Sequence, residues 1–199
     1  MARSGERSLH AVAINAYLAG HLLCGAGILL WIGLHWSCPD PLRFISYLLS
    51  AIVGAALKVR FPGVQGTQCV SFLFFFVAIL DLSPLEAVAV AAIPAAVQIL
   101  WHARYRPRPV QVAFAVANQT MTIGLCVWVY SRLHGLVPDP ITLAALSVVY
   151  FVANTVDVGG IIALTERTPL GGIVKDAIWI LPYYAGGFSA AWIVTLLPA

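Results

Sequence analysis

The chain has 199 residues, of which 61% are hydrophobic and only 10% are charged. Soluble domains carry about 25% charged residues, whereas a membrane helix needs about 20 consecutive apolar residues. Several stretches of this sequence are long and apolar enough to form a membrane helix. This excludes a soluble protein and indicates an all-α, polytopic helix bundle in a lipid bilayer. The net charge of +3 then reports membrane topology, and no nucleic-acid partner is expected.

The first predicted span is about Ala11–His35 and follows a cytoplasmic tail, residues 1–10. Arg3 and Arg7 ahead of an apolar run are typical of a signal peptide, but this run is much longer than the apolar core of one. We therefore expect a retained helix and treat residues 11–199 as one transmembrane bundle domain.

Six further spans follow, so the bundle is expected to have about seven transmembrane helices. Connections are short, which predicts that sequence neighbours are antiparallel neighbours in space. The third span is the shortest and is entered through a Gly- and Pro-containing loop. The predicted spans are about Leu42–Val59, Thr67–Leu82, Pro84–His102, Pro109–Tyr130, Pro140–Thr165 and Lys175–Leu197.

The lysines and arginines of alternate loops predict the orientation. Two of them, Arg43 and Arg132, fall on one side and nine fall on the other. This bias exists only if the short third segment crosses the membrane. The amino terminus is then cytoplasmic and the carboxyl end of this chain lies outside, in a bacterial inner (cytoplasmic) membrane. The nine are Arg3, Arg7, Lys58, Arg60, Arg104, Arg106, Arg108, Arg167 and Lys175.

The loop before the third span, which we call the coupling loop, contains Lys58, Arg60, Gly63 and Gly66. Non-helical backbone at membrane depth is tolerated only against protein or a water-filled cavity. We therefore expect this loop to pack inward, beside a site or a moving helix, and to couple an outer cavity to the cytoplasmic face.

A second basic cluster, Arg104, Arg106 and Arg108, follows the fourth span. Positive-inside anchoring accounts for it fully. Binding of anionic lipid, or contact with a cytoplasmic effector, is the alternative.

Polar side chains inside the spans are the candidate ligand-binding residues. Tyr150, Asn154 and Asp157 share one stripe of the sixth span. Asp157 is the costliest, since a carboxylate at mid-membrane costs about 2.5–3.5 kcal/mol on insertion scales. No cation is expected in the middle of a span to pair with it, which leaves a neutral acid or a proton switch.

Other spans add amides and a tyrosine, and two interpretations stay open for them: hydrogen bonds between helices, or the wall of a small-molecule cavity. Tyr183, next to the expected kink at Pro182, lies either at the interface or on such a wall. The complete candidate set is Gln98, Asn118, Tyr150, Asn154, Asp157 and Tyr183.

Motifs for catalysis or metal binding are scarce. The sequence contains no GxSxG, HExxH, P-loop or CxxC pattern. His21 and Cys24 lie one turn apart on the first span, and packing accounts for that spacing more simply than a metal does. We expect neither an enzyme nor a bound cofactor or metal.

Four segments, in this order, resemble bacterial membrane-embedded sensory input domains of the MASE kind, which precede GGDEF and HD-GYP modules. The resemblance implies that the protein senses a small molecule or membrane state. It also implies that this signal is relayed to a cyclic-di-GMP type output domain or partner. The resemblance is compatible with a homodimer. A cytoplasmic output domain would need one more span beyond this chain. The segments are LKVRFPGVQGTQCVSFLFFF (57–76), RPRPVQVAFAVAN (106–118), ANTVDVGGIIALTE (153–166) and LPYYAGGF (181–188).

A second resemblance is to the substrate-binding S-components of energy-coupling-factor vitamin transporters. It rests on a Gly-containing loop, a short aromatic helix and the stretch DLSPLEAVAVAAIPAA (81–96). It implies a small molecule bound in the outer half, with small-residue faces such as Ala91 and Ala95 meeting a transport partner. A structural subunit of a membrane complex is the third interpretation.

Overall fold

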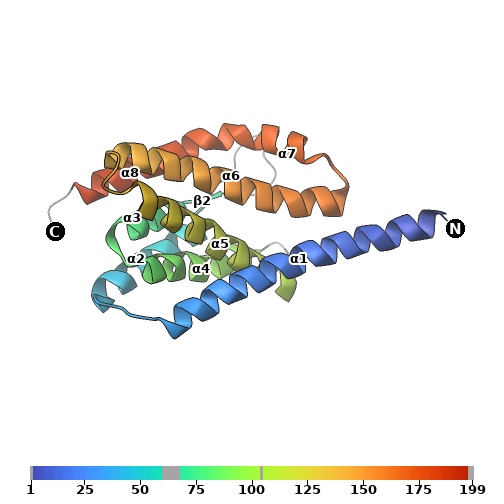
Figure 1. The fold of residues 1–199 in the computed structure, drawn as a ribbon, viewed down its shortest axis with the longest axis horizontal. Helices are drawn as coiled ribbons and strands as arrows, with labels where there is room; N and C mark the ends of the chain where they lie inside the picture. The colour runs from blue at the N-terminus through green and yellow to red at the C-terminus, as the bar shows by residue number, and fades with distance from the viewer. Residues whose placement is uncertain (1, 60–67, 104, 197–199) are drawn as a thin grey trace.

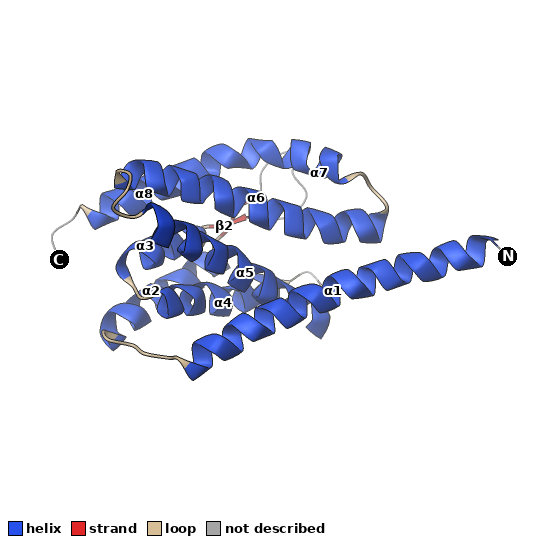
Figure 2. Ribbon diagram, in the orientation of Figure 1, coloured by secondary structure: helices blue, strands red, loops and turns tan. Residues whose placement is uncertain are grey.

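The structure is a computed structural model that describes residues 2–59, 68–103 and 105–196. The all-α prediction is confirmed, since the chain is 83% helical (Figures 1 and 2). The helices are α1 (Ala2–Leu34), α2 (Pro41–Ala56), α3 (Phe72–Asp81), α4 (Pro84–Leu100), α5 (Pro109–Leu133), α6 (Asp139–Glu166), α7 (Leu170–Ala177) and α8 (Leu181–Thr195), with the 3-10 turn η1 (Ile178–Ile180).

Four helical stretches of the described chain are long and apolar enough to cross a membrane. They are α1 from Leu9, α5, α6, and the continuous run from α7 to α8, which spans Leu170–Val194. In contrast, α2, α3 and α4 have 16, 10 and 17 residues. At about 1.5 Å per residue, α3 is only about 15 Å long, half the thickness of a hydrocarbon core.

Several helix boundaries differ from the predicted ones. The first candidate span, Leu9–Leu34, agrees with the prediction to within a few residues, but its helix continues back to Ala2, because nothing in the preceding residues stops it. The last span begins at Leu170, and η1 interrupts it just before Pro182, where a kink was expected. The predicted second span ends, and the predicted third span begins, in a small hairpin that the sequence did not predict. In this hairpin β1 (Lys58–Val59) pairs antiparallel with β2 (Gln68–Cys69).

The short helix α3 lies inside the bundle, where it contacts α2, α4, α5 and α8. Its direction is set by polar contacts at the two ends of the bundle. At one end the Arg43 guanidinium lies 2.9 Å from the Asp81 carboxylate, which joins the start of α2 to the end of α3. At the other end the Lys58 ammonium donates to the carbonyl of Trp101, beside the end of α4. The start of α2 therefore lies beside the end of α3, and the segment after α2 lies beside the end of α4.

The helices approach closely where glycine faces a neighbour. A Cβ added at Gly25 of α1 would lie 2.5 Å from the Cβ of Ala117 on α5, and one added at Gly187 of α8 would overlap the ring of Phe72. In membranes, where apolar lipid competes for the same surfaces, such close packing is a main source of helix association.

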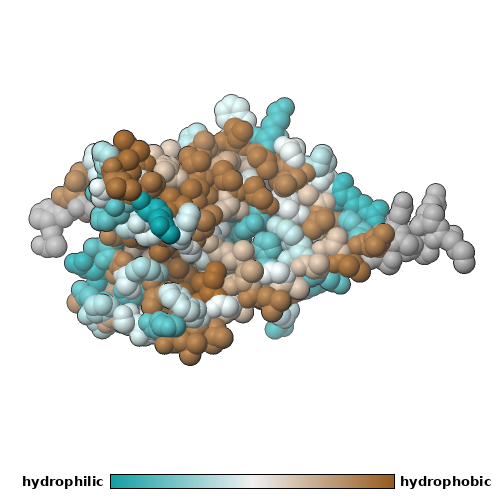
Figure 3. Space-filling model, viewed as in Figure 1, coloured by the Kyte–Doolittle hydropathy of each residue, from teal (hydrophilic) through white to brown (hydrophobic). Residues whose placement is uncertain are grey.

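The face in Figure 3 has broad apolar areas, with hydrophilic residues at its ends and in patches between them. Even the 16-residue helix α2 turns apolar side chains outward: Leu42 is 77% and Val53 is 61% exposed. Such a face is suited to lipid. The two chain ends lie at opposite ends of the bundle (Figure 1).

Candidate functional site

Helices α4, α5 and α6 each have a packed half and an open half. In the packed half, marked by Val90, Ile123 and Leu146, all 0% exposed, α3 fills the space between them. Phe76 of α3 contacts Tyr150 of α6 there, with ring centroids 5.7 Å apart. Because α3 is only ten residues long, it does not extend into the other half.

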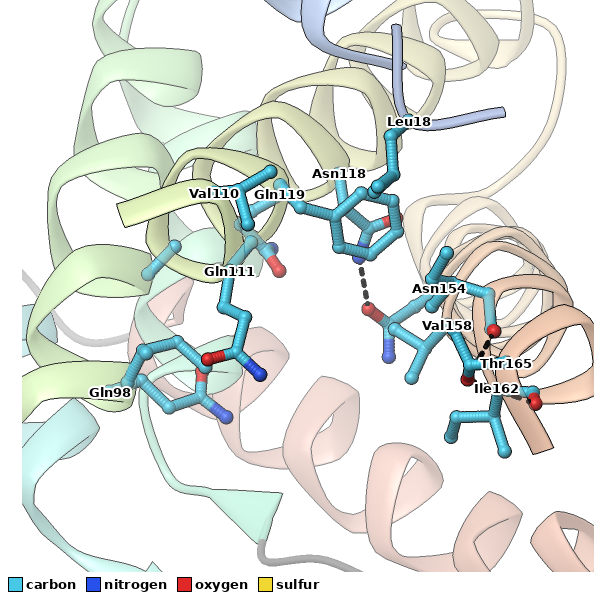
Figure 4. Close-up of a pocket in the computed structure, with 15 residues that line it drawn as sticks. Leu18, Gln98, Val110, Gln111, Asn118, Gln119, Asn154, Val158, Ile162 and Thr165 are labelled. Atoms are coloured by element: carbon cyan, nitrogen blue, oxygen red, sulfur yellow. Dashed lines mark hydrogen bonds between the residues drawn. The ribbon is translucent and has the colours of Figure 1, made fainter. Parts of the chain in front are cut away.

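A cavity of about 510 Å³ occupies the open half (Figure 4). It lies between the last turns of α4, the first turns of α5 and the second half of α6, with one residue of α1 at its edge. Its lining residues are Leu18, Ala95, Gln98, Ile99, Val110, Gln111, Phe114, Ala115, Asn118, Gln119, Asn154, Val158, Ile161, Ile162 and Thr165.

The lining combines apolar side chains with five amides and a threonine. No charged side chain is among the described residues that form it. A mostly apolar concavity with a few polar groups is the usual form of a small-molecule site, and sites of this kind have volumes of about 300–1,000 Å³.

Two pairs of polar side chains fix the inner wall of the cavity. The Asn118 side-chain nitrogen donates to the Asn154 amide oxygen at 2.9 Å, and the Gln119 amide nitrogen donates to the Tyr150 hydroxyl at 3.1 Å. Asn154 also hydrogen-bonds Tyr184 of α8. These contacts join three helices, so the predicted interhelical hydrogen bonds and the predicted cavity wall are formed by the same residues.

Two other amides at the cavity leave polar groups available. The Gln111 side-chain oxygen accepts from the Arg108 backbone N–H at 2.8 Å, which leaves its amide N–H groups unused. Gln98 has no hydrogen-bond partner within the described chain. Both lie on the same side of the cavity in Figure 4.

A second, smaller chamber of about 40 Å³ adjoins the cavity. Gln98, Gln119 and Asn154 line both spaces. The far side of the chamber is formed by Cys69 of β2 and by Ser71, ahead of α3. It is polar and large enough for a buried water molecule, which needs about 10–15 Å³ and two to four polar partners.

The coupling loop is described only at its two ends. Lys58 lies at the end of α4, and on the other side Cys69 and Ser71 are 5% and 2% exposed against the small chamber. The described part of this segment therefore packs inward beside the site. Arg60, Gly63 and Gly66 lie outside the described residues.

Asp157 does not line either space. It faces α1, where its Oδ1 lies 3.4 Å from His21 Nε2, and its backbone carbonyl accepts from the Tyr17 hydroxyl at 2.8 Å. His21 Nε2 makes no hydrogen bond of good geometry, and the contact with Asp157 is an ion pair only when the imidazole is protonated. The sequence predicted no cation within a span beside Asp157, whereas the structure places His21 there, a side chain that is cationic only when it is protonated.

Tyr183 also lies away from the cavity, with its ring centroid 4.7 Å from that of Phe72. Arg106 and Arg108 are exposed at the start of α5, and Arg104 is outside the described residues. The structure therefore brings together four of the six candidate ligand-binding residues: Gln98, Asn118, Tyr150 and Asn154.

Sequence reasoning missed part of the site. Gln119 directly follows Asn118 in the sequence. A search for residues on one helix face selects only one of two adjacent residues, but both of these side chains line the cavity. Phe114 and Leu18 are apolar and carry no signal of function. His21 could have been found only by pairing it with the one carboxylate predicted in mid-membrane.

Comparison with protein-family models, curated proteins and solved structures gave no match. The two family resemblances therefore stay predictions from the sequence. Among the described residues no group of three or more His, Cys, Asp or Glu side chains could hold a metal ion.

Proposed function

We propose that the protein is a membrane-embedded sensory input module that binds a small molecule between α4, α5 and α6. Occupancy of the site is relayed to a cyclic-di-GMP type output domain or partner in the cytoplasm. The observation that carries this proposal is the cavity of about 510 Å³, with its apolar walls and its few amides.

The proposal includes seven crossings of a bacterial inner membrane, four by long helices and three by the shorter α2, α3 and α4. The alternating chain directions and the outward apolar face of α2 support it. With the basic residues inside, the cavity belongs to the cytoplasmic half, because Val110 and Gln111 directly follow the basic Arg106–Arg108 segment.

Labelling with a membrane-impermeant maleimide tests this orientation. In a variant with all native cysteines replaced by alanine, Leu136→Cys should be labelled from outside intact cells and Tyr105→Cys only after lysis. Both positions are about four-fifths exposed, at 80% and 78%. Labelling of Tyr105→Cys in intact cells would contradict the proposed orientation.

Helix α1 is the element best placed for the relay. Leu18 lines the cavity, while Tyr17 and His21 on the same turns hold Asp157 of α6. Phe114 lines the cavity and lies against both Tyr17 and His21, with ring centroids 6.4 and 5.2 Å away. The amino-terminal part of α1 projects beyond the bundle (Figure 1), so a shift of α1 against α6 would reach the cytoplasm.

Native mass spectrometry of the gently purified protein tests for a retained ligand. The wild type should carry one non-covalent adduct, and Ala115→Trp, which fills the cavity, should lose it. Thr122→Val is the matched control, since Thr122 lies on α5 in the packed half and is only 1% exposed. An adduct that survives in Ala115→Trp would contradict binding in the cavity.

The transport alternative receives no specific support from the geometry. The S-component resemblance implies that Ala91 and Ala95 face a partner, but they are 0% and 4% exposed inside this chain. It also implies a site in the outer half, whereas the proposed orientation gives a cytoplasmic one. Cross-linking in native membranes separates the two: a GGDEF or HD-GYP protein favours sensing, and an ATPase pair favours transport.

A further inference from the structure

The cavity lining specifies a class of ligand, and this inference rests on the proposed function. We infer that the cavity takes an uncharged molecule with a planar apolar body and one polar edge that both donates and accepts, as a carboxamide or lactam does. Gln98 and Gln111 bind that edge.

The absence of charge follows from the lining. None of the described residues around the cavity is charged, and the nearby Asp157 carboxylate is turned away toward His21. A charged ligand would lose its hydration here without gaining a counter-charge, which is strongly unfavourable. A neutral molecule avoids that cost.

The polar edge follows from which amides are already used. Asn118 with Asn154 and Gln119 with Tyr150 are paired across the inner wall. Asn118 Oδ1 makes no hydrogen bond, but it is buried and does not reach the cavity surface. Gln98 keeps its whole amide available, and Gln111 keeps its N–H groups. An amide supplies both donors and an acceptor, so its best complement is a group that also does both.

The residues of the opposite wall indicate that the body of the ligand is apolar. Val158 and Ile162 of α6 lie across the cavity from Gln98 and Gln111 (Figure 4). Phe114 supplies an aromatic ring to the same space, against which a planar ring system packs well. Polar recognition is thus confined to one side, and the remainder of the ligand is apolar.

Three probes of nearly the same shape test this inference: 2-naphthamide, 2-naphthoate and 2-ethylnaphthalene. They differ in having a neutral polar edge, a charged edge and no polar group. Binding is measured by equilibrium dialysis against the full chain in nanodiscs, with empty nanodiscs correcting for partition into lipid. We expect naphthamide to bind about tenfold more tightly than ethylnaphthalene, since two hydrogen bonds contribute about three- to fivefold each, and naphthoate to bind most weakly.

Substitution of the two glutamines tests whether they bind the polar edge of the ligand. Gln98→Leu should lower naphthamide affinity about three- to fivefold and leave ethylnaphthalene unchanged, while Thr122→Val should change neither. Gln111→Leu, at an exposed position, provides the same test if Gln98→Leu does not fold.

Different failures have different meanings. Equal affinities for naphthamide and ethylnaphthalene, or tighter binding of naphthoate, would overturn the ligand class and leave the proposed cavity function standing. Binding of no probe to the wild type would overturn both. Naphthamide selectivity that survives in both glutamine variants would overturn the assignment of the polar edge.

Discussion

The packed half and the open half of the bundle are built on the same three helices, α4, α5 and α6, but they differ in what lies between them. In one half the phenylalanines of α3 fill the space, with Phe76 completely buried. In the other half a cavity lies between the same three helices, and no described residue of α3 lines it. The comparison indicates that a helix of ten residues, half the length of a standard span, leaves the second half of the bundle open because it starts only at Phe72.

The polar groups follow the same division. In the packed half, Thr120, Thr122 and Thr142 are buried among apolar neighbours and their hydroxyls have no partner within the described chain. In the open half, amides from three helices meet at the cavity. Substitutions on the two sides should therefore have opposite consequences for stability and for binding.

The largest effect is expected from removing an aromatic ring of the packed half. Phe76→Ala should lower the free energy of unfolding by about 3–5 kcal/mol, because it leaves an empty space in a close-packed core. Phe114→Ala, at the cavity wall, should cost less than Phe76→Ala, because that ring already borders open space. Unfolding in mixed micelles, followed by circular dichroism, measures both. Equal losses would remove the distinction between the halves.

A smaller loss is expected at the contact between α1 and α6. Asp157→Leu should cost about 2 kcal/mol, since it leaves His21 buried without its partner. Replacing both residues with leucine should recover most of that loss, because two packed apolar groups avoid the desolvation of both polar ones. A double variant as unstable as the sum of the single variants would show that the pair is not coupled.

The next effect concerns the hydrogen bond beside that pair. A Cβ at Gly160 would lie 2.5 Å from the Tyr17 hydroxyl, so Gly160→Ala should displace that hydroxyl from the Asp157 carbonyl and cost about 1 kcal/mol. Gly20→Ala is the control, since nothing lies within 4 Å of its added Cβ. This control should be neutral or stabilising by about 0.5–1 kcal/mol through helix propensity. The same unfolding assay applies, and a loss in Gly20→Ala that matches Gly160→Ala would contradict the assignment.

The smallest effect is expected for Thr122→Val. It removes a buried hydroxyl that has no partner and keeps the shape of the side chain, so the free energy of unfolding should change by less than about 0.5 kcal/mol. Asn118→Leu on the same helix should cost about 1 kcal/mol, because it breaks the bond to Asn154. A larger loss for Thr122→Val than for Asn118→Leu would show that the packed half contains the essential polar contact.

Much of the fold could be predicted from the sequence because apolar runs and prolines mark helices directly. Pro84 and Pro109 begin α4 and α5, as expected. The hairpin at Lys58 and Cys69 could not be predicted, since its strands are only two residues long and carry no alternating pattern. The unusual Gly- and Pro-containing segment did indicate that the helix after it, α3, is short.

The site was predictable only in part. Side chains on one stripe, such as Tyr150 and Asn154, could be grouped, because helical periodicity fixes which residues share a face. Which stripe faces a cavity and which faces a neighbouring helix depends on rotation and packing. That is why Asp157, one turn beyond Asn154, proved to face α1.

The most direct test of the account places one large residue in each half. Ala115 lines the cavity, and Ala91 on α4 lies in the packed half with no exposed surface. The free energy of unfolding of Ala115→Trp should stay within about 1 kcal/mol of the wild type, because the indole enters existing space. Ala91→Trp should lose about 3 kcal/mol or fail to fold, because close-packed neighbours must move. Equal losses at the two positions would contradict the claim that a cavity occupies the half of the bundle that α3 does not fill.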